Sequence, residues 1–347
     1  MPKWWTQLSW YAWAVYGGFW IWIAIATWRT TKGITRSSWV AIAIVIWVLV
    51  VEGLYSFQLR TRAWEPSAAE LGDDADEESS SSKFPKISQE VFETQQALLL
   101  NALQGIKPHH GNQRQIYALI YAPYSQDVFL RESAMVQQVL ETRFAARNHL
   151  VRLVNHNTTA MTIPWATNLN LERSLQVLAK AMDRKQDVIV IYLTSHGGSN
   201  FKLAASNWPL EVEPLTASQL RIMLDKAGIL NRVIAVSACY SGGWVEPLQG
   251  DNTLVMTAAD KDHTSFGCGN KSELTFFGRA IFDEQLRKTR SFEQAFQAAV
   301  PIIKQREIEG EKSDGFSNPQ IAVGASIQGV LNELVEQLAE EKKDRKN

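Results

Sequence analysis

Two long apolar runs dominate the first part of the chain. They cover residues 10–28, with the sequence WYAWAVYGGFWIWIAIATW, and residues 37–59, where Glu52 is the one charged side chain. A helix needs roughly 20 mostly apolar residues to cross a bilayer, and both runs reach that length. Their Trp and Tyr residues are typical of a membrane interface. We therefore predict an N-terminal transmembrane helical hairpin in residues 1–60, which binds the lipid bilayer.

Two other interpretations of these runs stay open. The first run would be a signal peptide if it were cut after residues 24–26, although only Lys3 precedes it and its aromatic side chains are bulky. Both runs could also be core helices of a soluble domain, which their length disfavours. Basic residues are slightly denser in the connector than on the outer flanks, which favours a cytoplasmic connector. We expect an integral inner-membrane protein whose soluble domain lies in the periplasm.

A polar segment separates the hairpin from the rest of the chain. Residues 72–82 read GDDADEESSSS, an acidic stretch followed by serines. Such a stretch buries too little apolar surface to fold. Residues 61–88 are therefore predicted to be a flexible linker.

From residue 89 onward, short apolar runs alternate with stretches of helical spacing. Predicted strands cover residues 115–122, 149–155, 187–194, 232–238, 253–259 and 318–324, and predicted helices cover 88–104, 128–147, 171–185, 216–228, 272–288 and 291–308. Strands that are apolar throughout and separated by helices indicate a mostly parallel sheet covered on both faces. We predict an α/β domain in residues 89–328. An amphipathic helix with a charged tail follows in residues 329–347.

Composition narrows the range of partners. The net charge is −1 and the pI is about 6.6, with Lys and Arg scattered along the chain. No basic stripe is present, so nucleic acid is not an expected partner. The two cysteines, Cys239 and Cys268, are too few for a disulfide framework.

Candidate chemistry lies at the ends of two predicted strands. His196 and a glycine pair follow strand 187–194, and Cys239 follows strand 232–238 with another glycine pair close behind. Ligands bind beyond the carboxyl ends of parallel strands. Cys239 comes 43 residues after His196, an interval that suits one crossover helix between neighbouring strands. The two side chains are thus predicted to meet.

A cysteine beside a histidine suits nucleophilic catalysis. The thiolate attacks an acyl carbon, while the imidazole moves protons to and from the reacting groups. The alternatives are a hydrogen-bonded structural histidine and a small buried cysteine, which are the commoner fates of such residues taken singly.

The segments IVIYLTSHGG and IAVSACYSGG resemble the paired motifs of the legumain-type cysteine peptidases. The resemblance covers roughly residues 112–325 and implies a caspase-like fold in a bacterial-looking, membrane-anchored member of the family. It implies a cysteine endopeptidase that acts on protein or peptide substrates, with His196 and Cys239 as the catalytic dyad. It further implies an oxyanion hole formed by the backbone N–H groups of Gly197 and Cys239, and no metal or organic cofactor.

The same resemblance suggests residues that bind substrate. Ser265 stands where the family has a serine in its primary specificity pocket, and Arg131 matches an arginine that reaches the same pocket. Ser237 replaces a pocket glutamate, and Arg279 replaces a pocket aspartate. With two arginines and no carboxylate, the pocket is predicted to be positive and to favour cleavage after Asp, with Glu or Asn as alternatives.

One departure concerns the third catalytic residue. The family has an asparagine two residues before the arginine, which orients the histidine, and this chain has Phe129 there. Asp127 is a candidate replacement.

Rival functions remain. A peptide transamidase or ligase would use the same site with an amine in place of water. A catalytically retired, membrane-bound interaction protein is supported by Phe129 alone, and a small-molecule transporter has little room in two spans.

Overall fold

The computed structural model describes residues 88–344 except 270, 271 and 313, together with residues 22, 25–30, 39–40, 42–44 and 46–47. The chain divides into two compact units, Met1–Ser80 and Ser81–Asn347. Over the described residues, no helix is both long and apolar enough to span a membrane. Most of the two predicted transmembrane runs, and nearly all of the predicted linker, lie outside the described residues.

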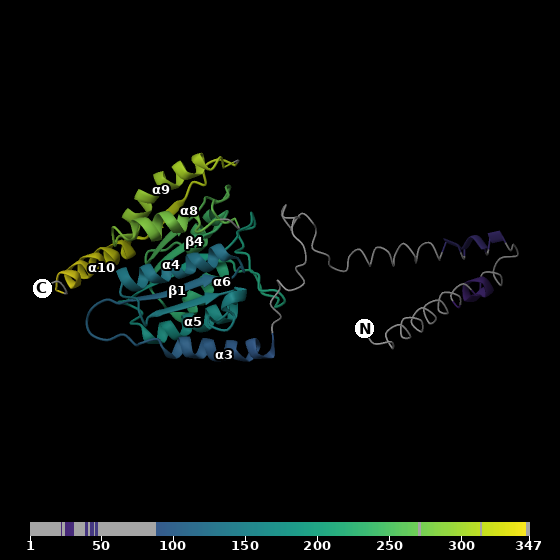
Figure 1. Ribbon diagram of the computed structural model, residues 1–347, viewed down its shortest axis with the longest axis horizontal. Helices are drawn as coiled ribbons and strands as arrows, with labels where there is room; N and C mark the ends of the chain where they lie inside the picture. The colour runs from purple at the N-terminus through teal and green to yellow at the C-terminus, as the bar shows by residue number, and fades with distance from the viewer. Residues whose placement is uncertain are drawn as a thin grey trace. The chain divides into compact units, whose positions relative to one another are not determined.

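A six-stranded sheet forms the centre of the second unit, in the order β2-β1-β3-β4-β5-β6 (Figure 1). The first five strands pair in parallel, and β6 pairs antiparallel with β5. The mostly parallel α/β sheet predicted from the sequence is therefore confirmed. The strands are β1 (Ile116–Ala122), β2 (Leu150–Val154), β3 (Val188–Thr194), β4 (Asn231–Ser237), β5 (Thr253–Thr257) and β6 (Gln320–Val323).

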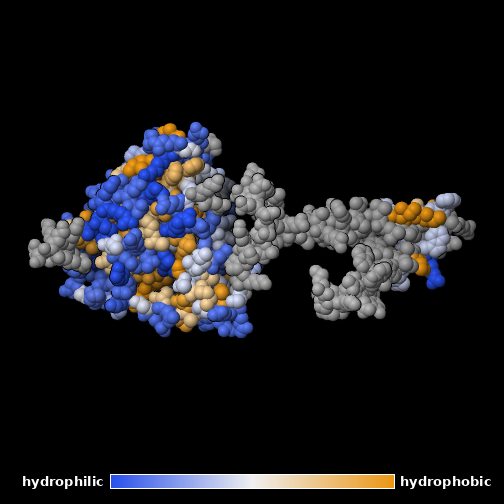
Figure 2. Space-filling view, in the orientation of Figure 1, coloured by the Kyte–Doolittle hydropathy of each residue, from blue (hydrophilic) through white to orange (hydrophobic). Residues whose placement is uncertain are grey.

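Helices cover both faces of this sheet, as Figure 1 shows for α3 and α5 on one side and α8, α9 and α10 on the other. One face carries α4 (Asp127–Arg143), α8 (Phe276–Gly278), η3 (Arg279–Gln285), α9 (Phe292–Glu309) and α10 (Ala325–Asp344). The other face carries α3 (Gln89–Gln104), α5 (Asn168–Ala181), α6 (Ala217–Ala227) and α7 (Val245–Leu248). Short 3-10 turns η1 (Asn157–Thr159) and η2 (Ser241–Trp244) complete the described elements. In the same view, Figure 2 shows mostly hydrophilic outer side chains with hydrophobic ones between them.

The apolar strands are the reason for this layering. Every residue of β1, β3 and β4 is buried, because successive side chains enter opposite cores. In β3, Val190 and Tyr192 belong to the core under α4 and α9, whereas Ile189, Ile191 and Leu193 belong to the core under α5 and α6.

Two of the helices begin at side-chain caps. Thr216 and Gln219 form a complete capping box at the start of α6, and the Ser291 side chain accepts a hydrogen bond from the Gln294 N–H at the start of α9.

The predicted helix 272–288 is replaced by a shorter and different element. The helical part begins at Phe276, and Arg279–Gln285 is a π-helix. Its start is set by tertiary contact, since the Thr275 N–H donates to the Glu132 carboxylate at 2.8 Å. A side chain at Gly278 would come within 2.5 Å of that carboxylate.

The C-terminal helix begins at Ala325, earlier than the predicted 329, and Ile327 joins the core with Leu331, Leu334 and Leu338.

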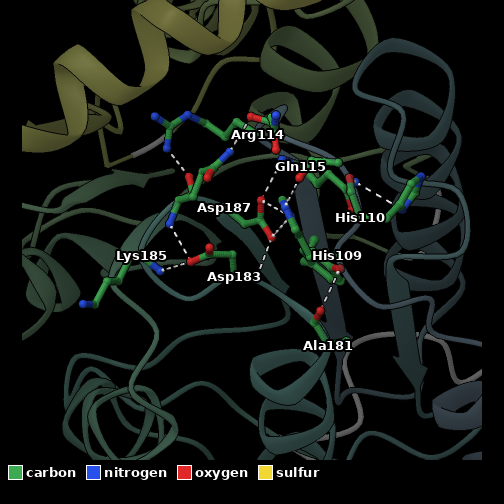
Figure 3. A network of polar contacts seen from close by, with 12 residues as sticks. His109, His110, Arg114, Gln115, Ala181, Asp183, Lys185 and Asp187 are labelled. Carbon is green, nitrogen blue, oxygen red and sulfur yellow. Dashed lines mark hydrogen bonds and ion pairs between the residues drawn. The ribbon is translucent and has the colours of Figure 1, made fainter.

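A buried carboxylate ties the loop before β1 to the start of β3 (Figure 3). Asp187 is completely buried and accepts hydrogen bonds from the Gln115 and Asp183 N–H groups, each at 2.8 Å. The His109 Nδ1 lies 2.9 Å from the same carboxylate. A buried charge is tolerated only when it is paired and hydrogen-bonded, and Asp187 meets both conditions. His109 thus has a structural role.

We predict that Asp187→Asn lowers the free energy of unfolding by about 3 kcal/mol, because it removes one member of a buried pair. Urea denaturation followed by circular dichroism would measure the change. Asp283→Asn, which removes a surface pair with Arg287, is the control and should cost less than about 1 kcal/mol. Equal effects of the two substitutions would contradict the role given to Asp187.

Candidate active site

The pairing of β3 with β4 brings the two motif residues to one place. Thr194 and Ser237, the last residues of these strands, lie directly opposite each other in parallel register. His196 and Cys239 each follow two residues later. The prediction that these two strands are sheet neighbours is therefore confirmed.

Glycine at position 197 allows the two strand ends to approach closely. A Cβ built on Gly197 would lie 2.1 Å from the carbonyl oxygen of Cys239, so no other residue fits without a shift. Tyr240, directly after the nucleophile candidate, has the left-handed φ of 54° and turns the chain into η2. The turn after Cys239 is thus held in a conformation that side-chain-bearing residues seldom adopt.

The Cys239 thiol sits among hydrogen-bond donors. The Ser265 N–H donates to its Sγ at 3.3 Å, and the Ser265 hydroxyl lies 3.6 Å away. A hydrogen bond from Cys268 is the main cause that lowers the pKa of the Cys239 thiol to about 6, with Ser265 adding to the effect and burial opposing it. The same hydrogen bond raises the pKa of Cys268. At pH 7, Cys239 is therefore largely a thiolate.

His196 is held by a glutamine and two aromatic rings. Its Nε2 lies 2.6 Å from the Gln126 Oε1. The Tyr124 and Phe129 rings meet the imidazole edge to face, at centroid distances of 4.7 and 5.1 Å. Burial lowers the pKa of His196, so the ring is neutral at pH 7. The acidity of Cys239 is thus attributed to Cys268 and Ser265.

Gln126 was missed in the sequence because it belongs to no motif and stands just before α4. Asp127, the predicted replacement for the family asparagine, is engaged elsewhere. Its carboxylate lies 2.8 Å from the His156 Nε2 and 3.4 Å from the Arg131 guanidinium. Phe129 contacts the imidazole only through its ring.

Ser237 is placed beneath the strand ends, where it is only 1% exposed. Its hydroxyl lies 3.0 Å from that of Thr275. The buried Glu132 carboxylate joins the same network, accepting hydrogen bonds from the Tyr192 and Thr194 hydroxyls at 2.7 Å each. Ser237 therefore braces the site, and we do not assign it to substrate binding.

The two pocket arginines have partners of their own. Arg131 donates to the carbonyl oxygens of Ser272 and Glu273, at 2.7 and 3.1 Å. The Arg279 guanidinium lies 2.7 Å from the Glu273 carboxylate. With Asp127 beside Arg131, two carboxylates balance the two guanidinium groups. The predicted positive pocket thus loses much of its electrostatic basis. Ser265 lies beside the nucleophile candidate.

No group of three or more His, Cys, Asp or Glu side chains with metal-binding arrangement occurs in the described ranges.

Residues 166–323 match a family model described as the peptidase C13 family. These residues, somewhat less than half of the chain, are similar to that family. The legumain-type resemblance is thereby confirmed, and the region is that of a legumain-like cysteine-type peptidase. It contains His196, Cys239, Ser265 and Arg279, whereas Gln126 and Arg131 precede it. A search of curated proteins finds no match.

The low pKa of Cys239 predicts a specific pH dependence of its alkylation. In the native protein, the rate with iodoacetamide should fall to half its maximum near pH 6, because only the thiolate reacts. In Cys268→Ala the midpoint should move upward, since the main donor that lowers the pKa is lost. Cys268→Ser, which keeps a donor, should retain a midpoint near that of the native protein.

Cys239 is the only cysteine in both variants, so labelling is unambiguous. An unchanged midpoint in Cys268→Ala would refute the role of Cys268.

Proposed function

We propose that this protein is a membrane-anchored cysteine endopeptidase that works through a Cys239–His196 dyad. The observation that carries the proposal is the level pairing of β3 and β4, which ends both strands at one edge of the sheet with His196 and Cys239 just beyond. The peptidase C13 match over the same residues supports it.

The reaction follows from the chemistry of the two side chains. The Cys239 thiolate attacks the scissile carbonyl carbon and forms a tetrahedral intermediate that still carries the amine. His196 takes up a proton from solvent at Nδ1 and passes it to the departing amine, which leaves a thioester on Cys239 and the ring neutral again. Acting next as a base, the neutral imidazole takes a proton from the water that releases the acid product.

Backbone donors are available for the developing oxyanion. Neither the Gly197 nor the Cys239 N–H has a hydrogen-bond acceptor among the described residues. The N–H groups of the residues that follow them are bonded, Gly198 to the Lys202 carbonyl and Tyr240 to the His263 carbonyl. Free N–H groups beside the nucleophile are suited to stabilise negative charge on the carbonyl oxygen. We assign the oxyanion hole to these two groups.

Asp or Asn is the proposed residue before the cleaved bond. Arg131 and Arg279 favour Asp where their ion pairs open for substrate, and the balanced charge of the closed pairs favours Asn. Ser265, beside Cys239, is the proposed hydrogen-bonding contact to the substrate.

The membrane anchor is proposed from the apolar runs at residues 10–28 and 37–59. Their length and aromatic ends support a transmembrane hairpin, and the charge distribution supports an inner-membrane protein with the peptidase domain in the periplasm. Protease accessibility in spheroplasts, compared with inverted vesicles, would test that orientation.

The full chain should hydrolyse fluorogenic peptides with Asn or Asp before the scissile bond at least roughly tenfold faster than matched peptides with Glu, Arg or Ala. Cys239→Ala should abolish turnover. Mass spectrometry with an added amine would separate hydrolysis from transamidation, since the amide product marks a transferase. Turnover that survives in Cys239→Ala, or no turnover of any peptide, would contradict the proposed function.

A further inference from the structure

The His196 ring has one polar partner in the described part of the chain, and that partner is neutral. The Nε2 lies 2.6 Å from the Gln126 Oε1, whereas Nδ1 has no hydrogen bond to any described residue. Tyr124 and Phe129 hold the ring plane by edge-to-face contacts. The imidazole is therefore fixed in position with one nitrogen bonded and the other open.

The identity of the partner atom determines which nitrogen carries the proton. A carboxamide oxygen accepts hydrogen bonds but cannot donate one, so the neutral ring must carry its hydrogen on Nε2. The lone pair then remains on Nδ1. That nitrogen is left to exchange protons with the reacting groups at Cys239.

The start of α4 holds Gln126 where this contact is possible. Its backbone is extended at the helix N-cap, its N–H donates to the Tyr124 carbonyl at 2.8 Å, and its own carbonyl accepts from the Phe129 and Leu130 N–H groups. Both rings that flank His196 therefore belong to the turn that Gln126 organises. The acid that follows it in sequence, Asp127, is paired with His156 and Arg131.

We propose that Gln126 is the positioning residue of His196, fixing the Nε2–H tautomer and thereby taking the role that the absence of asparagine at position 129 leaves open. The inference rests on the proposed peptidase function. It adds a residue that lies outside both sequence motifs and outside the region that matches the peptidase C13 family.

Kinetics of Gln126→Ala should separate positioning from binding. We expect kcat to fall about 10- to 100-fold with little change in KM. This loss is smaller than the roughly 10²- to 10⁴-fold that general acid–base catalysis contributes as a whole, because the imidazole itself remains. Alkylation of Cys239 by iodoacetamide should keep its rate, because the thiol is bonded to Ser265 and Cys268. Gln138→Ala, at an exposed position of the same helix, is the matched control and should keep native kcat.

The pH–kcat profile of Gln126→Glu distinguishes a positioning role from a merely structural one. A carboxylate in this position still accepts the hydrogen bond but stabilises the imidazolium, so the pKa of His196 rises. The acidic limb of the pH–kcat profile, which needs the neutral ring, should shift to higher pH. Native kcat in Gln126→Ala, or an unmoved profile in Gln126→Glu, would overturn the proposal. If Gln126→Ala fails to fold, the Gln126→Glu profile decides.

A spectroscopic test does not depend on turnover. In protein labelled with ¹⁵N-histidine, His196 should give the shifts of the Nε2–H tautomer in the native chain and of a mixture in Gln126→Ala, with assignment by His196→Gln. Native shifts in Gln126→Ala would refute the positioning role even if no peptide is cleaved. Failure of the native protein to hydrolyse any peptide, with the tautomer shift present, would instead count against the proposed function alone.

Discussion

The level pairing of β3 and β4 is the constraint on which the site depends. Their parallel ladder runs from Val188 opposite Asn231 to Thr194 opposite Ser237, so both strands end at the same height. A slip of one residue would turn every side chain of a strand toward the wrong core, and burial on both faces therefore fixes the register. Once the register is fixed, the segments that carry His196 and Cys239 emerge side by side.

Neutral hydrogen-bond donors and acceptors, more than charges, then shape the two reactive groups. Cys268 and Ser265 lower the pKa of the Cys239 thiol, while burial lowers the pKa of His196 and Gln126 holds its ring. These surroundings favour the thiolate form of Cys239 and the neutral form of His196. The buried carboxylates stabilise the structure around the site instead. Glu132 connects the loop at Thr275 to α4. Asp187 connects the starts of β1 and β3, at the end of the sheet away from the site.

The sequence was sufficient for features that depend on local pattern. Continuous apolar strands separated by helices predicted the sheet, and the spacing of the two strand-end motifs predicted that β3 and β4 are neighbours. The contact of Gln126 with His196 could not be predicted from local pattern, because it depends on where the start of α4 lies relative to the end of β3. The same is true of Cys268 and of the pairing of Arg279 with Glu273, which turned an apparently positive pocket into a balanced one. The start of the helical segment at Phe276 likewise depends on a distant residue, Glu132, which bonds Thr275 and packs against Gly278.

The central claim is that Cys239 forms a covalent acyl intermediate. The most direct measurement is mass spectrometry of an acid-quenched reaction between the full chain and a peptide ester ending in Asn or Asp. The account predicts a mass increase equal to the acyl group, mapped to Cys239 and absent from Cys239→Ala. An acyl group on another residue, or hydrolysis without any covalent intermediate in a chain that still turns over after Cys239→Ala, would contradict it.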